Sequence, residues 1–239
     1  MLKEYSHLLF GPAWYHLWFL YMIIGLYMLV PLLRIFIQNA KEEHYRYFFI
    51  IFILFGCALP LLSDTLLLVD NRLNINFNIK ELLGFSGYFI LGYYLSNYEI
   101  SKRVKRLIYI LAAASVIFQI IGTILISYKL NIANILLYKN STPNVAIQAI
   151  AVFLIIKETS VKIHFYEKAK SILFTLSKYS FGIYLVHDLF NQFFSKLGFT
   201  PTYFNPLLMI PFRAIITFIL SFLIIWVLDK IPFIRKHCL

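Results

Sequence analysis

The chain has 239 residues, of which 61% are hydrophobic, 18% aromatic and 14% charged, and its mean hydropathy is +0.77. A water-soluble domain must cover its surface with polar atoms, and this composition leaves too few of them. The net charge of +11 would suit nucleic-acid binding in a soluble chain, but most Lys and Arg residues fall in short loops between apolar runs, so we expect an all-α, polytopic transmembrane helical bundle that binds no nucleic acid.

Seven apolar runs, bounded by stretches that contain charged residues, Pro, Asn or Gly, are candidates for membrane-spanning helices. A helix needs about 20 residues to cross roughly 30 Å of hydrocarbon. The second, third and fifth runs are shorter, and flanking residues such as 135–138 can complete them. The predicted spans are residues 16–37, 47–62, 82–97, 107–128, 142–156, 171–195 and 206–228.

The distribution of basic residues predicts the orientation of these spans. One set of alternate loops holds fourteen of the twenty-two Lys and Arg residues. By the positive-inside rule this set is cytoplasmic, which places the N-terminus outside and the C-terminus inside. No repeat or interdomain linker is evident, so we treat residues 1–239 as a single domain.

The first span carries polar and aromatic residues that a simple membrane anchor does not need. His16 lies between Tyr15 and Trp18 at the predicted outer end, and Arg34 lies at the cytoplasmic end. Aromatic residues commonly mark the membrane interface, which favours an interfacial belt. Histidine is also a usual general base near neutral pH and can deprotonate a sugar hydroxyl when a donor is in reach. Both interpretations of His16 stay open.

A basic cluster precedes the fourth span and consists of Lys102, Arg103, Lys105 and Arg106. The positive-inside rule explains these residues as a topological anchor. The same charges can attract the phosphates of a nucleotide-bearing donor. In the third span, we expect Gly84, Gly87 and Gly92 to let another helix backbone approach closely.

The sixth span has polar residues along one face. Five of them recur at intervals of three, four, three and four residues, which stacks them on one side of a helix: Ser177, Ser180, Tyr184, His187 and Asn191. Such a stripe should face protein or a water-filled cavity and not lipid. These side chains either bond to neighbouring helices or take part in a functional site.

Asp188 and Arg213 are charged residues inside the sixth and seventh spans. Counted inward from the outer ends at 1.5 Å per residue, both lie roughly 10 Å below the surface. An isolated charge at that depth is costly, whereas a carboxylate and a guanidinium neutralise each other. We expect the two side chains to pair, either as a clamp between adjacent helices or as a substrate contact.

Three segments stand out in order along the chain. The first is Tyr-His-Leu-Trp-Phe-Leu at residues 15–20, followed by Gly25-Leu26-Tyr27 and Pro31-Leu32-Leu33-Arg34. The others are residues 87–95, with Gly-Tyr-Phe and Gly-Tyr-Tyr-Leu, and residues 180–187, Ser-Phe-Gly-Ile-Tyr-Leu-Val-His. Together they resemble the membrane-bound acyltransferase 3 family across most of this chain.

The resemblance implies a bundle of about ten helices that transfers acyl groups, typically acetyl, from cytoplasmic acetyl-CoA to hydroxyls of cell-envelope polysaccharides or related sugars. It further implies a multi-pass protein of the bacterial cytoplasmic (inner) membrane, with the lipid bilayer, an acyl-CoA donor and a glycan acceptor as partners. The family's domain has both termini in the cytoplasm. An outside N-terminus fits that plan if about three helices are missing at the front, so we expect an N-terminally truncated member.

The site expected from this resemblance is incomplete. The histidine regarded as catalytic in the family, with an accompanying arginine, belongs to a first helix that nothing here matches. We therefore expect His16 or His187 to hold the proton, in a cavity lined by Tyr15, Trp18, Arg34, Ser180, Tyr184, Asp188, Asn191 and Arg213.

No metal is expected, because neither Cys57 nor Cys238 has the spacing of a zinc site. Two other functions stay open. Intramembrane charges and polar stripes also mark translocation routes, which would suit an exporter of a polysaccharide or a lipid-linked sugar. The chain would be an inactive remnant if its base is lost. The sequence does not indicate the oligomeric state.

Overall fold

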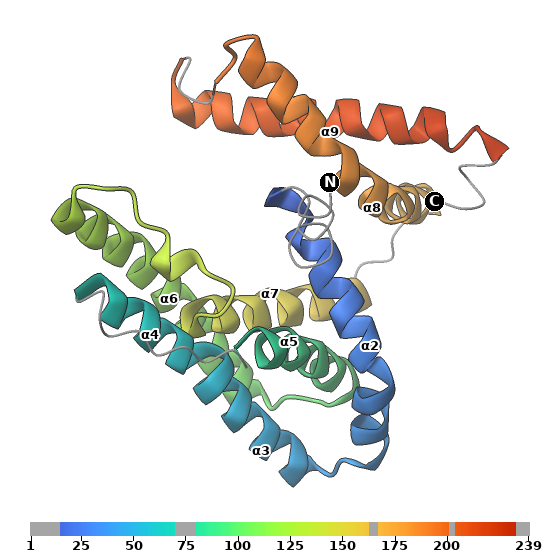
Figure 1. The fold of residues 1–239 in the computed structure, drawn as a ribbon. Helices are drawn as coiled ribbons and strands as arrows, with labels where there is room; N and C mark the ends of the chain where they lie inside the picture. The colour runs from blue at the N-terminus through green and yellow to red at the C-terminus, as the bar shows by residue number, and fades with distance from the viewer. Residues whose placement is uncertain (1–14, 70–79, 163–166, 201–203, 233–239) are drawn as a thin grey trace, which may run out of the picture. The chain divides into compact units, whose positions relative to one another are not determined.

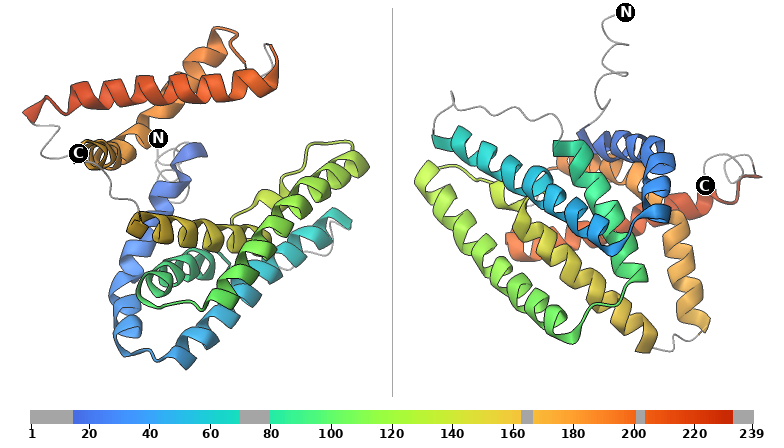
Figure 2. Two further views of the ribbon diagram at one scale, coloured as in Figure 1. Left: turned by 180° about the vertical axis from the view of Figure 1, so that it is seen from behind. Right: turned by 90° about the horizontal axis from the view of Figure 1, so that it is seen from below.

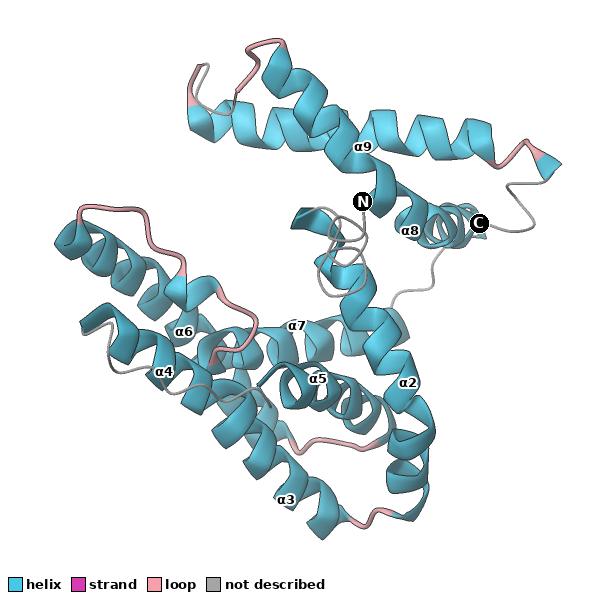
Figure 3. Cartoon of the chain, in the orientation of Figure 1, coloured by secondary structure: helices cyan, strands magenta, loops and turns pink. Residues whose placement is uncertain are grey.

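The computed structural model describes residues 15–69, 80–162, 167–200 and 204–232. Within these ranges all regular secondary structure is helical, as the sequence predicts (Figure 3). The elements are η1 (Tyr15–Leu17), α2 (Trp18–Asn39), α3 (Glu42–Ile51), η2 (Phe52–Ala58), α4 (Leu59–Val69), α5 (Lys80–Asn97), α6 (Lys102–Leu130), η3 (Leu136–Tyr138), α7 (Pro143–Lys162), α8 (Glu167–Lys196) and α9 (Pro206–Leu228).

Each of the seven predicted spans coincides with a helical segment. Among the described residues, four segments are both long and apolar enough to cross a membrane: Trp18–Asn39, Glu42–Leu68, Lys102–Leu130 and Pro206–Leu228. The other predicted spans correspond to α5, α7 and α8. Large apolar side chains are exposed along these helices, which suits a lipid environment, and the chain is a polytopic helical membrane protein.

The second span is longer than predicted and contains a π-helix. We expected it to end at Leu62, before Ser63 and Asp64, but the helix continues to Val69. Asp64 does not end the helix, because its carboxylate accepts from Lys139 Nζ at 2.8 Å. The π-helix η2 ends two residues before Pro60. The ring of a proline clashes with the preceding turn of a regular α-helix, and its nitrogen has no N–H to donate. The wider turn accommodates that proline.

The chain divides into two compact units, which are drawn in Figures 1 and 2. Unit 1 comprises residues 1–19 and 164–239, so its described part holds η1, the first two residues of α2, α8 and α9. Unit 2 comprises residues 20–163 and holds the rest of α2 and the helices from α3 to α7.

The core of unit 2 lies where α5 packs against η2. Phe52, Cys57, Leu91 and Leu154 are buried there, and the Cys57 thiol is free. Two glycines make this contact possible. A Cβ at Gly56 would lie 3.4 Å from the backbone nitrogen of Gly84, and a Cβ at Gly87 would overlap the ring of Phe52. The prediction that another backbone approaches closely is confirmed for Gly84, whereas the close neighbour of Gly87 is the side chain of Phe52.

Gly92 does not have the predicted role, because nothing lies within 4 Å of the position of its absent Cβ. It therefore offers a matched control on the same helix. We expect Gly87→Val to destabilise unit 2 by about 1–3 kcal/mol, because the added methyl groups must displace Phe52 from the core. Gly92→Val carries the same loss of helix propensity without the overlap. Thermal unfolding of both variants in detergent checks this, and equal losses would contradict it.

A polar network joins α6 and α7, which run side by side within unit 2 (Figure 2). Gln148 Nε2 donates to Gln119 Oε1 at 2.8 Å and to Ser115 Oγ at 3.1 Å. Asn144 Nδ2 donates to the carbonyl of Leu137 in η3 at 2.8 Å. Side-chain hydrogen bonds of this kind hold membrane helices together where the hydrophobic effect does not distinguish helix from lipid.

In unit 1, α8 packs against α9. Gly182 sits against Ile225, where an added Cβ would lie 2.9 Å from Cδ1, and Tyr179 and Ile183 complete the buried contact. At the end of α9, Asp229 accepts from Lys178 Nζ at 2.6 Å and from the Tyr179 hydroxyl at 2.8 Å. This pairing fixes the register of α8 on α9, and with it the height of the polar residues farther along α8.

Candidate functional site

A polar cluster, called the His16 cluster below, forms in unit 1 where η1 meets α8. Its members are His16, Tyr184, His187, Asp188 and Gln192. The His16 imidazole places Nδ1 3.6 Å from Oδ2 of Asp188. The exposed fraction of the His16 side chain is 13% and that of Asp188 is 2%. A carboxylate so deeply buried requires polar partners. One turn along α8, Gln192 Nε2 supplies a hydrogen bond of 2.7 Å to the same oxygen.

Tyr184 and His187 surround the imidazole from α8. The Tyr184 hydroxyl donates to the backbone carbonyl of His16, which ties η1 to α8. The His187 ring meets the His16 ring edge to face, with centroids 5.3 Å apart, and its Nδ1 donates to the carbonyl of Tyr184. Phe19 packs edge to face on Tyr184 at 5.3 Å. The base candidate is therefore held by backbone, ring and carboxylate contacts together.

Arg213 of α9 has other contacts than the predicted ion pair with Asp188. Its Nη2 donates to the backbone carbonyl of Asn191 at 3.0 Å and lies 3.4 Å from Ser195 Oγ, while its guanidinium carbon lies 5.9 Å from the Phe194 ring centroid. The sequence predicted an ion pair because Asp188 and Arg213 lie at similar distances from the ends of their helices. In the structure the two side chains contact different partners. Arg213 clamps α9 onto the C-terminal turns of α8, and Asp188 faces His16.

Three other predicted site residues lie in the described part of unit 1: Asn191, Trp18 and Ser180. Asn191 contacts α9, because its Oδ1 accepts from the Thr217 hydroxyl at 3.4 Å. Trp18 is 45% exposed and packs on Phe19. Ser180 is exposed, and its hydroxyl donates to the carbonyl of Ser177 on its own helix.

Two further predicted site residues fall elsewhere. Arg34 is exposed and belongs to unit 2. The side chain of Tyr15 lies outside the described residues.

The polar stripe of α8 faces the interior only from Tyr184 onward. The face of α8 that carries Tyr179 and Ile183 meets α9, and Ser180 points away from it.

Three polar residues with partners on α8 were not predicted: Gln192, which belongs to the cluster, and Thr217 and Asp229, which lie elsewhere along the contact of α8 with α9. Gln192 follows Asp188 by four residues, a helical spacing that could have identified it as the carboxylate's donor. Thr217 and Asp229 have no such signal, because their partners lie on α8 and are far away in sequence.

A sequence model of a protein family, described as an acyltransferase domain, matches residues 3–227 and so runs across both units. The chain belongs to the acyltransferase 3 family. This acyltransferase is an integral membrane protein, in agreement with its apolar helices. Comparisons with curated proteins and with solved structures gave no match.

The geometry places the His16 imidazole of this acyltransferase beside a buried carboxylate, with Nδ1 3.6 Å from Oδ2 of Asp188. Both ring nitrogens of His16 are buried, and Nδ1 lies beyond hydrogen-bond distance of Asp188. The carboxylate therefore acts on the ring through its charge, which stabilises the imidazolium that forms when His16 takes up a proton. Among the described residues no group of His, Cys, Asp and Glu has the arrangement of a metal site.

Replacing Tyr184 by Phe tests how far the backbone tie positions His16. The ring contacts with Phe19 and His187 remain, and one hydrogen bond is lost. We expect about 1 kcal/mol lower stability and a several-fold lower rate of acyl transfer, with an unchanged KM for the donor. Tyr21→Phe, on the part of α2 that belongs to unit 2, is the control. An unchanged rate in Tyr184→Phe would show that the tie does not position the base.

Proposed function

We propose that this acyltransferase is an O-acetyltransferase that moves acetyl from acetyl-CoA to a hydroxyl of a cell-envelope polysaccharide or a related sugar, with His16 as the general base. The single observation that carries the proposal is the His16 imidazole 3.6 Å from the buried carboxylate of Asp188, in a chain of an acyltransferase family. An oriented imidazole is the group that acceptor activation needs.

The reaction begins when His16 Nε2 takes the proton from the acceptor hydroxyl. The acceptor oxygen attacks the thioester carbonyl carbon, and a C–O bond forms. The carbon–sulfur bond then breaks, and the CoA thiolate leaves with the proton that the imidazolium returns. The Asp188 carboxylate balances the positive charge of the imidazolium between these steps, as in other pairs of a base and an orienting acid.

His187 supports His16 rather than replacing it. Its Nδ1 is engaged by the carbonyl of Tyr184 on its own helix, whereas Nδ1 of His16 faces a carboxylate. Only the His16 arrangement has a negative charge beside the ring. For this reason we assign the proton transfer to His16 and a packing role to His187.

The test uses membranes that contain this chain and membranes that lack it, each incubated with acetyl-CoA labelled in the acetyl group. We expect label to appear in envelope glycan as an ester that mild alkali releases, only where the chain is present. An exporter of polysaccharide or lipid-linked sugar would instead change the amount of glycan outside the membrane without forming a labelled ester. That outcome, or no difference between the membranes, would overturn the proposed reaction.

A further inference from the structure

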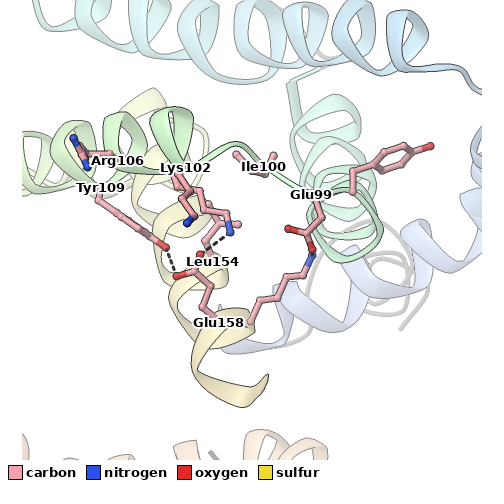
Figure 4. Close-up of a pocket in the computed structure, with 10 residues that line it drawn as sticks. Glu99, Ile100, Lys102, Arg106, Tyr109, Leu154 and Glu158 are labelled. Carbon is pink, nitrogen blue, oxygen red and sulfur yellow. Dashed lines mark hydrogen bonds and ion pairs between the residues drawn. The ribbon is translucent and has the colours of Figure 1, made fainter. Parts of the chain in front are cut away.

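Unit 2 contains a pocket of about 580 Å³ at the loop that joins α5 to α6, a volume within the range of small-molecule sites (Figure 4). It is formed by the loop that follows α5, the first turns of α6 and the last turns of α7. The lining residues are Tyr98, Glu99, Ile100, Lys102, Lys105, Arg106, Tyr109, Leu154, Lys157 and Glu158. None of these residues belongs to the His16 cluster.

The pocket is lined by more cationic side chains than carboxylates. Lys105 Nζ contacts Glu158 at 2.6 Å, and Tyr109 donates to the other oxygen of that carboxylate, as Figure 4 shows. Lys157 donates to the carbonyl of Leu95 at 2.8 Å and lies 4.0 Å from Glu99. Four cations therefore share two carboxylates around one cavity.

Lys102 and Arg106 are the cations that have no carboxylate within ion-pair distance in the described part of the chain. They stand four residues apart on α6, so their like charges lie one above the other on the same face. The first turn of α6 contains no acidic residue, and cations there oppose the helix dipole. Both effects disfavour the empty pocket and are relieved when an anion binds between the two side chains.

We propose that this pocket binds the phosphate groups of an amphiphilic ligand, with Lys102 and Arg106 as the phosphate contacts and Ile100 and Leu154 as the apolar surface. Two sources carry this chemistry: the nucleotide part of an acyl-CoA and the headgroup of an anionic phospholipid. The acyl-CoA source rests on the proposed function, whereas the phosphate chemistry does not. The positive-inside rule predicts that the pocket faces the cytoplasm, where a soluble CoA thioester is found.

A matched pair of arginines separates ligand binding from topology. Arg103 lies in the same turn of α6 as Lys102, but it does not line the pocket. A purely topological role predicts that Arg103 and Arg106 are interchangeable, because the positive-inside rule counts charges and not their direction. A phosphate site predicts that only Arg106 matters.

The experiment uses the full chain, purified and placed in nanodiscs of phosphatidylcholine. Binding of labelled coenzyme A, which has no acyl group to transfer, is measured for the unchanged chain, the double variant Lys102→Gln/Arg106→Gln, and the control Arg103→Gln. We expect the double variant to bind at least about tenfold more weakly and the control to be unchanged, since charge-assisted hydrogen bonds are lost only in the first. The charge-keeping variant Lys102→Arg/Arg106→Lys should retain binding, which excludes a general folding defect.

A second arm measures, by native mass spectrometry, how much phosphatidylglycerol remains on the chain after purification from nanodiscs that contain it. Loss of lipid retention in the double variant, with no coenzyme A binding by the unchanged chain, supports the pocket and identifies the lipid as its source. The proposal is overturned if the double variant weakens neither ligand, or if Arg103→Gln weakens binding equally. Coenzyme A binding that depends on the pocket in a chain without acetyl transfer would retain this inference and remove the proposed reaction.

Discussion

His16→Gln is expected to lower the rate of acetyl transfer by about 10²- to 10⁴-fold, the range that general-base catalysis contributes. Glutamine keeps the length and polarity of the side chain but cannot take up a proton near neutral pH. His16 lies in η1, and 13% of its side chain is exposed. The variant should stay folded, because the Tyr184 hydroxyl bonds to the backbone carbonyl of residue 16 and not to its side chain. The measurement is the initial rate of labelled ester formation by purified chain at saturating acetyl-CoA.

His44→Gln is the control for this change. His44 is exposed at the start of α3 in unit 2, where its Nδ1 accepts from the backbone N–H of Lys41, and a glutamine oxygen can accept the same bond. Its rate should equal that of the unchanged chain. If His16→Gln keeps full activity, His16 belongs to the interfacial belt and another group activates the acceptor.

Asp188→Asn is expected to reduce the rate by about 10²-fold or more with little change in the KM for acetyl-CoA. Asparagine has the same shape, and its side-chain oxygen can still accept from Gln192, so folding should survive. What is lost is the negative charge 3.6 Å from Nδ1 of His16, which stabilises the imidazolium. The measurements are kcat and KM, determined separately over a range of pH.

Two further variants make this result specific to a positioning role. Asp188→Glu should recover part of the rate, because it restores the charge. Asp64→Asn removes a carboxylate that pairs with Lys139 in unit 2 and should leave catalysis unchanged. A pH–rate profile that is identical in Asp188→Asn and the unchanged chain would contradict a role of this carboxylate in proton transfer.

Much of the fold can be predicted from the apolar runs and from the charged, Pro, Asn and Gly residues that bound them. Each apolar run became a helix, because lipid requires every backbone hydrogen bond to be made within the segment. The predictions that were wrong depend on contacts between residues far apart in the sequence, which local patterns do not show. The helix that runs through Asp64 was predicted to stop because a charge resembles a loop signal, and its partner Lys139 is invisible in the local sequence. Likewise, the spacing of glycines does not tell that Gly87 meets Phe52 whereas Gly92 meets nothing.

The site was predictable in its residue types but not in its pairings. His16, Tyr184 and Asp188 stand out because polar groups are rare in membrane helices, and the structure brings all three together. Depth along a helix placed Asp188 and Arg213 at one level, yet level does not fix rotation about the helix axis. The structure gives Arg213 the carbonyl of Asn191 instead. The assignment of single-domain organisation, truncation and orientation remains a prediction.

Acetyl transfer by His16 and Asp188 is tested by a mass balance on the purified full chain in nanodiscs, supplied with labelled acetyl-CoA and envelope glycan. We expect each labelled acetyl ester formed on the glycan to be accompanied by one molecule of free coenzyme A, and His16→Gln to abolish both together. Release of coenzyme A without ester, or ester formation that is equal in His16→Gln, would contradict acyl transfer by the His16 and Asp188 pair.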